Sequence, residues 1–254
     1  MLPRLKAPCT FRAPHEGQTP GMSADANTGA GRHRERTMDS QRVCDNAVQS
    51  PQEELVNSAL HGLGLLLAIS GAFVLVNEAA YQAQALRLFC ATIFAVTMVV
   101  LYGTSTLYHI LERGSVKDRL QRLDRTAITF LIAGTYTPVA LLMVRGALGA
   151  FLCLGEWLLV AVAVALMVRD PLDFPRRSVW LYQGMGWLTA LGAWPLFQHT
   201  AMPVLAALAL GGACYIGGVL FLVNDRVKYF HAISHVCALL GTAFQFWAIS
   251  QYLG

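Results

Sequence analysis

Two histidines, His231 and His235, stand four residues apart near the C-terminus of the chain. Residues four apart share one face of an α-helix, so both imidazoles would point the same way. Such a pair can fill two positions of a tetrahedral metal site. The pair alone is a weak signal, because histidines also occur at the ends of membrane helices, where their rings have an apolar body and a polar tip.

A third histidine, His109, could complete this set from a distant part of the sequence. Three protein ligands leave one position of a zinc ion for water, which is the pattern of catalytic sites. Zinc lowers the pKa of such a water to about 7 and so generates a nucleophile near neutral pH. The alternative for His109 is a hydrogen bond between two helices without any metal.

Asp124 and Ser105 are the candidate catalytic residues. Asp124 is predicted to hold or deprotonate the water. Ser105 lies one turn before His109, so it would share that helix face and could orient a ligand or a substrate carbonyl. The alternative for Asp124 is a helix cap, because Asp is favoured at the first position of a helix.

The elements that position these residues follow from the composition. Of 254 residues 55% are apolar and 13% are charged, where about 25% charged is usual in a soluble domain. The apolar residues form blocks of the length that an α-helix needs to cross a bilayer, roughly 20 residues. We therefore predict an all-α, polytopic integral membrane protein, and the net charge of +4 gives no reason to expect nucleic-acid binding. The seven expected transmembrane helices cover 57–77, 88–110, 124–143, 147–168, 178–197, 203–223 and 230–252.

Lysine and arginine predict the orientation of these spans, because cytoplasmic loops are enriched in both. Alternate loops carry most of the positive charge, which places the N-terminus in the cytoplasm and the C-terminus outside. We expect a multi-pass protein of the plasma (inner) membrane. The cytoplasmic residues would be Arg32, Arg34, Arg36, Arg42, Arg113, Lys117, Arg119, Arg122, Arg125, Arg169, Arg176, Arg177, Arg226 and Lys228, against Arg87 and Arg145 on the other side.

This topology brings the polar residues of several spans to one depth. Ionisable groups within a membrane are costly, so each is a functional candidate. Their convergence near the predicted cytoplasmic boundary favours a metal site more than any one of them does. The converging residues are Asn57, His61, Ser105, His109, Asp124, His231 and His235.

The chain divides into two parts by composition. Residues 1–50 are rich in Pro, Gly, Arg and small polar residues, and they have no sustained apolar period. Such a segment cannot bury enough apolar surface to fold, so we predict a disordered tail. Residues 51–254 would form the membrane domain. The six cysteines show no CxxC pair and no disulfide framework.

The residues of this domain resemble the hemolysin III family, which belongs with the progestin and adipoQ receptors and, more loosely, with alkaline ceramidases. The resemblance covers residues from about 50 to 254, in order and at the expected spacing. It rests on Glu54, Asn57, His61 and Gly64; on Ser105 to His109; on Leu123-Asp124 and Ala133 to Pro138; on Tyr182 to Trp187 and Gly211 to Tyr215; and on Phe230 to His235.

The resemblance implies a seven-helix fold with a cytoplasmic N-terminus and a bound Zn²⁺. Its ligands would be His109, His231 and His235, and Asp124 would reach the ion through water. Glu54, Asn57 and His61 would surround and orient these ligands. The chain departs from the family at Gln245, where many relatives carry a further histidine.

Three functions remain open at this point. The leading hypothesis is a zinc-dependent hydrolase that acts on an amide or ester of a membrane lipid. The second is a hemolysin-like pore or cytolytic protein, as the family name suggests, although the spans lack the charged rings or filter-like loop of a channel. The third is a receptor or membrane-homeostasis sensor with structural zinc.

Overall fold

A computed structural model describes residues 49–253, apart from 113 and 172–173. The predicted disordered tail lies almost wholly outside the described residues. The described part is α-helical and contains no strand, so the predicted all-α class is confirmed. Its elements are α2 (Pro51–Tyr81), α3 (Ala85–Ile110), α4 (Ser115–Pro138), the π-helix η1 (Val139–Val144), α5 (Gly146–Arg169), α6 (Phe174–Ala190), α7 (Ala193–His199), α8 (Met202–Leu222) and α9 (Phe230–Leu253).

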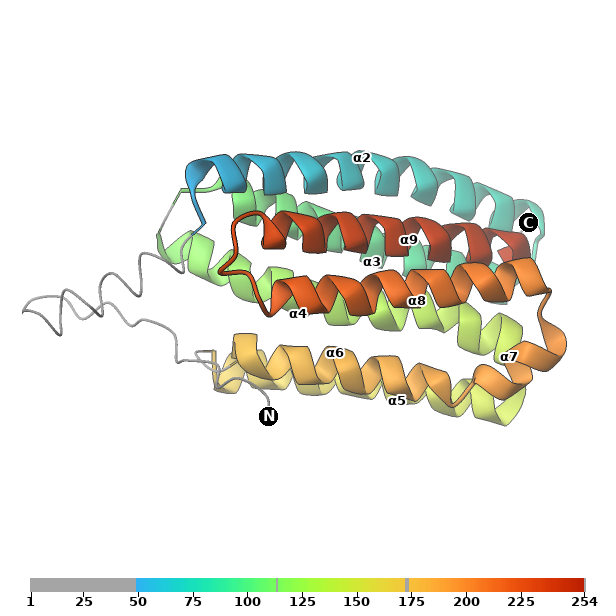
Figure 1. The fold of residues 1–254 in the computed structure, drawn as a ribbon. Coiled ribbons are helices and arrows are strands. Elements are labelled where there is room, and N and C mark those ends of the chain that lie inside the picture. Colours follow the sequence, from blue (N-terminus) through green and yellow to red (C-terminus); the bar gives the residue numbers. More distant parts are fainter. Residues whose placement is uncertain (1–48, 113, 172–173, 254) are drawn as a thin grey trace, which may run out of the picture. The chain divides into compact units, whose positions relative to one another are not determined.

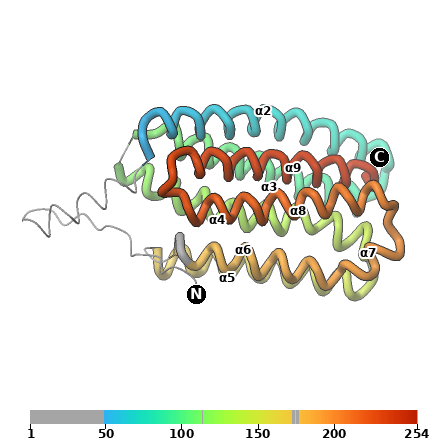
Figure 2. Tube along the Cα trace, viewed as in Figure 1, coloured from blue at the N-terminus to red at the C-terminus, as the bar shows by residue number. Residues whose placement is uncertain are grey.

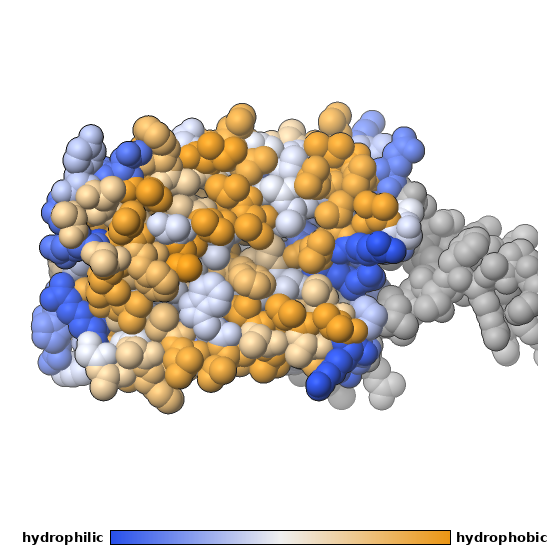
Figure 3. Space-filling view, turned by 180° about the vertical axis from the view of Figure 1, so that it is seen from behind, coloured by the Kyte–Doolittle hydropathy of each residue, from blue (hydrophilic) through white to orange (hydrophobic). Residues whose placement is uncertain are grey.

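The surface of the helices is apolar where lipid would lie. Large apolar side chains such as Phe73, Leu154 and Trp194 are exposed along the helices. Figure 3 shows hydrophobic side chains over the middle of one face and hydrophilic ones gathered at its two ends. Apolar surface of this extent is rare on soluble monomers and suits a hydrocarbon environment. Six helical segments are long and apolar enough to cross a membrane among the described residues: α2, α3, α4 with η1, α5, α8 and α9.

The fifth expected span, 178–197, is divided between α6 and α7. The backbone N–H groups of Leu191 and Gly192 bond to the carbonyls of Leu188 and Thr189, which tightens the last turn of α6 and ends it. Pro195 lies in the first turn of α7, where its missing N–H is tolerated. Neither α6 nor α7 reaches the length of the other spans, so the seventh membrane crossing stays a prediction.

Helix α4 lies at the centre of the helix packing. It contacts α3, α5, α6 and η1, and α4 with η1 is the most buried of the six long segments. A Cβ atom on Gly134 would lie 2.8 Å from Cβ of Thr97, so α3 and α4 approach as closely as glycine allows. Pro138 has no N–H to donate to the carbonyl of Gly134, and the chain continues beyond it as η1.

The helices run side by side, and the starts of α2, α4 and α9 lie at the same end of the described part as the end of α3 (Figures 1 and 2). Contacts between α2 and α3, α3 and α4, and α2 and α9 hold them together. The residues that were expected to share one depth all lie on these four helices, within about three turns of those ends.

The direction of insertion is a prediction that rests on the distribution of Lys and Arg. A phosphatase reporter that is active only outside the cytoplasm, fused after Gly254, should be active. The same reporter inserted after Leu111, in the connection between α3 and α4, should be inactive. The reverse pattern of activities would show that the chain inserts the other way round.

Candidate metal centre

Three histidines from two helices come together at this end of the structure. His109 comes from the last turn of α3, and His231 and His235 come from the first two turns of α9. One nitrogen of each ring lies within 4.8 Å of the corresponding nitrogens of the other two, and all three side chains are buried. Their ring centroids are 4.5–5.3 Å apart and the rings meet edge to face. We call these residues the histidine triad, and their arrangement could hold a metal ion.

The nitrogen atoms that face one another in the triad suit shared coordination. Nε2 of His109 lies 3.0 Å from Nε2 of His235. Two nitrogens on one tetrahedral zinc ion would lie about 3.3 Å apart, given Zn–N bonds of about 2.0–2.1 Å. Neither ring nitrogen of His231 has a hydrogen-bond partner among the described residues. A buried imidazole without a partner is costly, and a metal ion would satisfy it.

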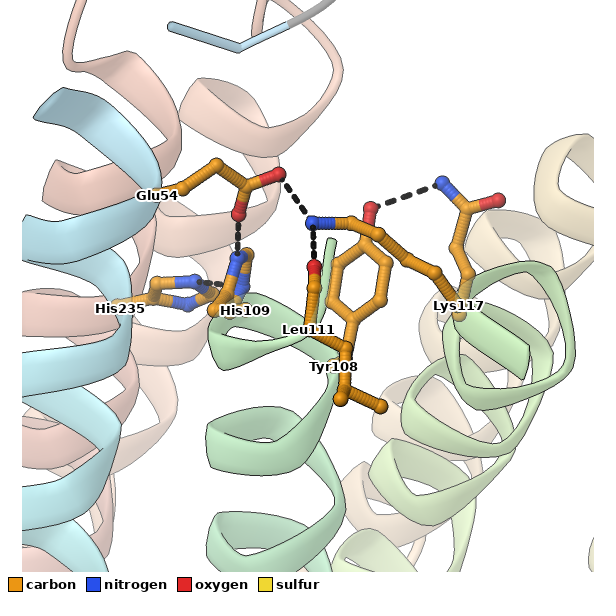
Figure 4. A network of polar contacts seen from close by, with 7 residues as sticks. Glu54, Tyr108, His109, Leu111, Lys117 and His235 are labelled. Carbon is orange, nitrogen blue, oxygen red and sulfur yellow. Dashed lines mark hydrogen bonds and ion pairs between the residues drawn. The ribbon is translucent and has the colours of Figure 1, made fainter. Parts of the chain in front are cut away.

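Glu54 fixes which nitrogen of His109 faces the triad. Its carboxylate lies 2.7 Å from Nδ1 of His109 (Figure 4). With the proton on Nδ1 donated to this carboxylate, Nε2 keeps its lone pair and points toward His235. A carboxylate on the far nitrogen is the usual support of a metal-bound histidine, because it sets the ring orientation and raises its basicity.

Lys117 holds Glu54 in turn. Its Nζ donates to the second Glu54 oxygen at 2.6 Å and to the carbonyl of Leu111 at 3.0 Å (Figure 4). The same Nζ lies 5.0 Å from the ring centroid of Tyr108, a cation–π distance. Lys117, from the start of α4, therefore links the orientation of His109 to the packing of α3, α4 and α2.

Asn57 and His61 lie one and two turns after Glu54 on α2, and both are buried. The ring of His61 lies 3.9 Å from that of His235 and 5.3 Å from that of Tyr102, measured between centroids. Neither nitrogen of His61 has a hydrogen-bond partner among the described residues. The structure thus brings His61 beside the triad, although it is not within the closest set.

Asp124 and Ser105 lie beside each other on the α4 side of the triad. The Asp124 carboxylate lies near the Ser105 hydroxyl and the His109 ring, but the hydroxyl forms no hydrogen bond among the described residues. Both side chains are buried. Asp124 does not belong to the set of ligand atoms that lie within 4.8 Å of one another.

The alternative that Asp124 caps a helix is wrong. Helix α4 begins at Ser115, after Gly114, so Asp124 lies more than two turns inside it. The segment from Ser115 to Leu123 is too polar to read as membrane span, but it is helical all the same. Helix capping therefore does not explain why Asp124 is a buried carboxylate.

A hydrogen bond to α2 holds the connection between α8 and α9 just before His231. The backbone N–H of Tyr229 donates to the Glu53 carboxylate at 2.8 Å, and Tyr229 has the left-handed φ of 64°. Burial raises the pKa of Asp225 from its ordinary value, and the neighbouring Arg125 and Arg226 act in the opposite direction. The Glu53 carboxylate of α2 thus holds the turn that leads into the two histidines of α9.

A family model described as "Haemolysin-III related" matches residues 49–246. The chain belongs to this hemolysin III family. It is 35% identical to the "Hemolysin-3 homolog" of Bacillus subtilis (strain 168), over 79% of this chain and 94% of the relative. It is 32% identical to the "Hemolysin-3" of Bacillus cereus, over 81% of this chain and 94% of the relative.

A more distant relative is the "Monocyte to macrophage differentiation factor" of Homo sapiens, which is 28% identical over 64% of this chain and 70% of its own length. With the six long apolar segments, the family confirms a polytopic membrane protein. The family match contains all three triad histidines. Gln245, the departure from the family pattern, lies away from them and donates to the carbonyl of Leu208 at 3.1 Å.

Sequence reasoning missed Lys117 as part of this centre. It was counted only as a positive residue that sets the orientation of the spans. A signal was available, because Lys117 lies eight residues after His109 across a short connection. Its role depends on Glu54, which comes from another helix, so the spacing alone could not pair the two.

Metal analysis of the purified protein tests the triad. We expect about one metal ion per chain in the wild type and a loss of most of it in His235→Ala, because two histidines bind far more weakly than three. His199→Ala is the matched control, since His199 is exposed on α7. Equal metal contents in the wild type and His235→Ala would contradict the triad.

The role of Glu54 is tested by metal affinity. Loss of a carboxylate partner costs about 10–100-fold in affinity at metal-bound histidines. Glu54→Gln should therefore keep the metal but bind it about 10–100-fold more weakly, measured by competition with a chelator. Glu78→Gln, on the same helix but near its other end, should behave as wild type. An unchanged affinity in Glu54→Gln would mean that the contact with His109 does not support a ligand.

Proposed function

We propose that this protein is a zinc-dependent hydrolase that cleaves an amide or ester bond of a membrane lipid. The observation that carries the proposal is the composition of the centre. Three buried histidines form the close set, and a carboxylate and a hydroxyl lie next to them. Nitrogen ligands of this kind suit zinc, and three of them leave a position open for chemistry.

Each residue has a distinct part in this proposal. His109, His231 and His235 would hold the ion, with Glu54 fixing the tautomer of His109. The bound zinc would supply an activated water and polarise the carbonyl of the substrate. Asp124 would accept the proton of the attacking water and return it to the leaving group. Ser105 would donate a hydrogen bond, either to Asp124 or to the substrate carbonyl.

The position of the centre favours a lipid over a water-soluble substrate. The triad lies within about two turns of helix ends, on helices whose outer surfaces are apolar. A centre near the ends of membrane-spanning helices would lie close to the level at which the polar linkage of a lipid meets its acyl chains. A lipid could therefore present an amide or ester bond to the centre while its chains stay in the bilayer.

Asp124→Asn tests the proton transfer that the proposal requires. The change is nearly isosteric and leaves the three histidines in place, so the metal content should not change. Turnover of ceramide-like or phospholipid substrates should fall by about 10²–10⁴-fold, the usual worth of a general base. The measurement is product formation by purified protein in mixed micelles, with and without a chelator.

Asp118→Asn is the matched control, because Asp118 is an exposed carboxylate in the first turn of the same helix. It should keep both metal and activity. An unchanged rate in Asp124→Asn would remove the proposed base, and loss of metal would make Asp124 a structural residue. Wild-type protein that holds zinc but turns over none of these lipids would favour the sensor with structural zinc.

A further inference from the structure

Helix α5 carries a carboxylate that plays no part in the metal centre. Glu156 is fully buried, and neither of its oxygens has a hydrogen-bond partner among the described residues. It lies on the inward face of α5 with Leu152 and Val160. Sequence reasoning passed over it, although a lone Glu inside an apolar span is a functional signal in its own right.

Glu156 lies near the middle of α5, one of the long apolar segments. At a rise of about 1.5 Å per residue, it is about 15 Å from the start of α5 and about 20 Å from Arg169 at its end. Its neighbour on α4 is Tyr136, about 18 Å along that helix from Asp124. The environment of Glu156 is therefore separate from the candidate metal centre.

Hydrogen bonds between the neighbouring side chains connect the three helices next to Glu156, although none of them involves its carboxylate. The Tyr136 hydroxyl donates to the carbonyl of Thr189 in the last turn of α6, at 3.1 Å. The Thr137 hydroxyl accepts from the indole N–H of Trp157, the residue after Glu156, at 3.1 Å. Cys153, one turn before Glu156, also reaches Thr137. Glu156 thus lies where α4, α5 and α6 meet.

The two helices next to Glu156, α4 and α6, are both interrupted close to Tyr136 and Thr189. Helix α4 gives way to η1 after Pro138, and α6 ends at Ala190 before α7 begins. Interruptions of this kind free backbone carbonyls, and within a membrane they are tolerated only inside the protein or around a cavity. In membrane transporters, broken helices of this kind provide the carbonyls that coordinate Na⁺ or H⁺ sites.

An ionised Glu156 would have no positively charged partner among the described residues. No described basic side chain interacts with it. The ionisable groups that face it are Tyr136 from α4 and Cys153 from α5, which are both uncharged near neutral pH. From α6, the turn Leu188 to Ala190 has no ionisable side chain. Burial of an unpaired carboxylate is too costly to persist, so the group must bind a cation.

We propose that Glu156 anchors a mid-membrane site for a small monovalent cation, a proton or a sodium ion, where α4, α5 and α6 meet. One carboxylate offers a single negative charge, which one monovalent cation neutralises. The available donors are hydroxyl and carbonyl oxygens, which suit small hard cations. A divalent ion would ordinarily draw on more than one carboxylate, and Glu156 is the only one that these contacts supply among the described residues.

Thermal denaturation of the purified full chain tests the site. The variants are Glu156→Gln, which removes the charge at constant shape, and Glu112→Gln, an exposed control. Ionisation of Glu156 without a cation should destabilise the fold. The Tm of the wild type and of the control should therefore fall with rising pH in choline chloride, relative to the Tm of Glu156→Gln.

The salt separates the two cations. Restoration of the wild-type Tm by sodium chloride, with no such effect in Glu156→Gln, would assign the site to sodium. A pH dependence that sodium leaves unchanged would assign it to a proton. The same pH and sodium dependence in all three proteins would overturn the proposal.

A labelling experiment on the wild type keeps the proposal testable if Glu156→Gln does not fold. A hydrophobic carbodiimide reacts with protonated carboxyls in apolar surroundings, and mass spectrometry locates the adduct. Labelling of Glu156 should fall by about tenfold per pH unit once the group ionises, and sodium should reduce it further if sodium binds. Absence of labelling, or labelling that neither pH nor sodium changes, would contradict a cation site.

Discussion

The cost of placing polar groups in hydrocarbon governs this structure more than any single contact does. Every buried charge or imidazole in a membrane span must find a partner in the protein, a ligand or water. At the end where α2, α3, α4 and α9 meet, the partners are provided by Glu54, Lys117 and the histidines themselves. The rings of His231 and His61 lack such partners among the described residues, and this is the physical reason to place a ligand there.

Packing deeper in the bundle holds this arrangement in place. The Tyr102 hydroxyl donates to Thr242 on α9 at 2.7 Å, and Tyr215 of α8 lies 2.9 Å from the same oxygen. The Tyr102 ring in turn packs against His61, next to His235. A Cβ atom on Gly64 would lie 2.5 Å from Tyr102, so α2 can approach only because this residue is glycine. These contacts hold α2, α3 and α9, which carry His61, His109 and the two histidines of α9, together next to the candidate centre.

Much of the fold could be predicted because hydrophobic blocks report membrane spans directly. The six long segments and the meeting of His109 with His231 and His235 followed from span order and residue depth. However, hydropathy indicates the apolar part of a helix. It does not show how far the helix extends beyond that part. The polar start of α4 was missed for that reason, and with it the true position of Asp124. The break between α6 and α7 was missed because Pro195 and Gly192 lie in sequence that is as apolar as the spans around it.

The number of ligands in the close set bears on the choice between a catalytic and a structural metal. A structural zinc site usually closes its coordination with four protein ligands, most often including cysteine. Among the described residues only three histidines form the set, and none of the described cysteines belongs to it. The nearest carboxylates either support a ligand, as Glu54 does, or stand outside the set, as Asp124 does. A closed site would require Asp124 to move into contact with the ion. Outside the set, its carboxylate would be placed to act on a water bound to the ion.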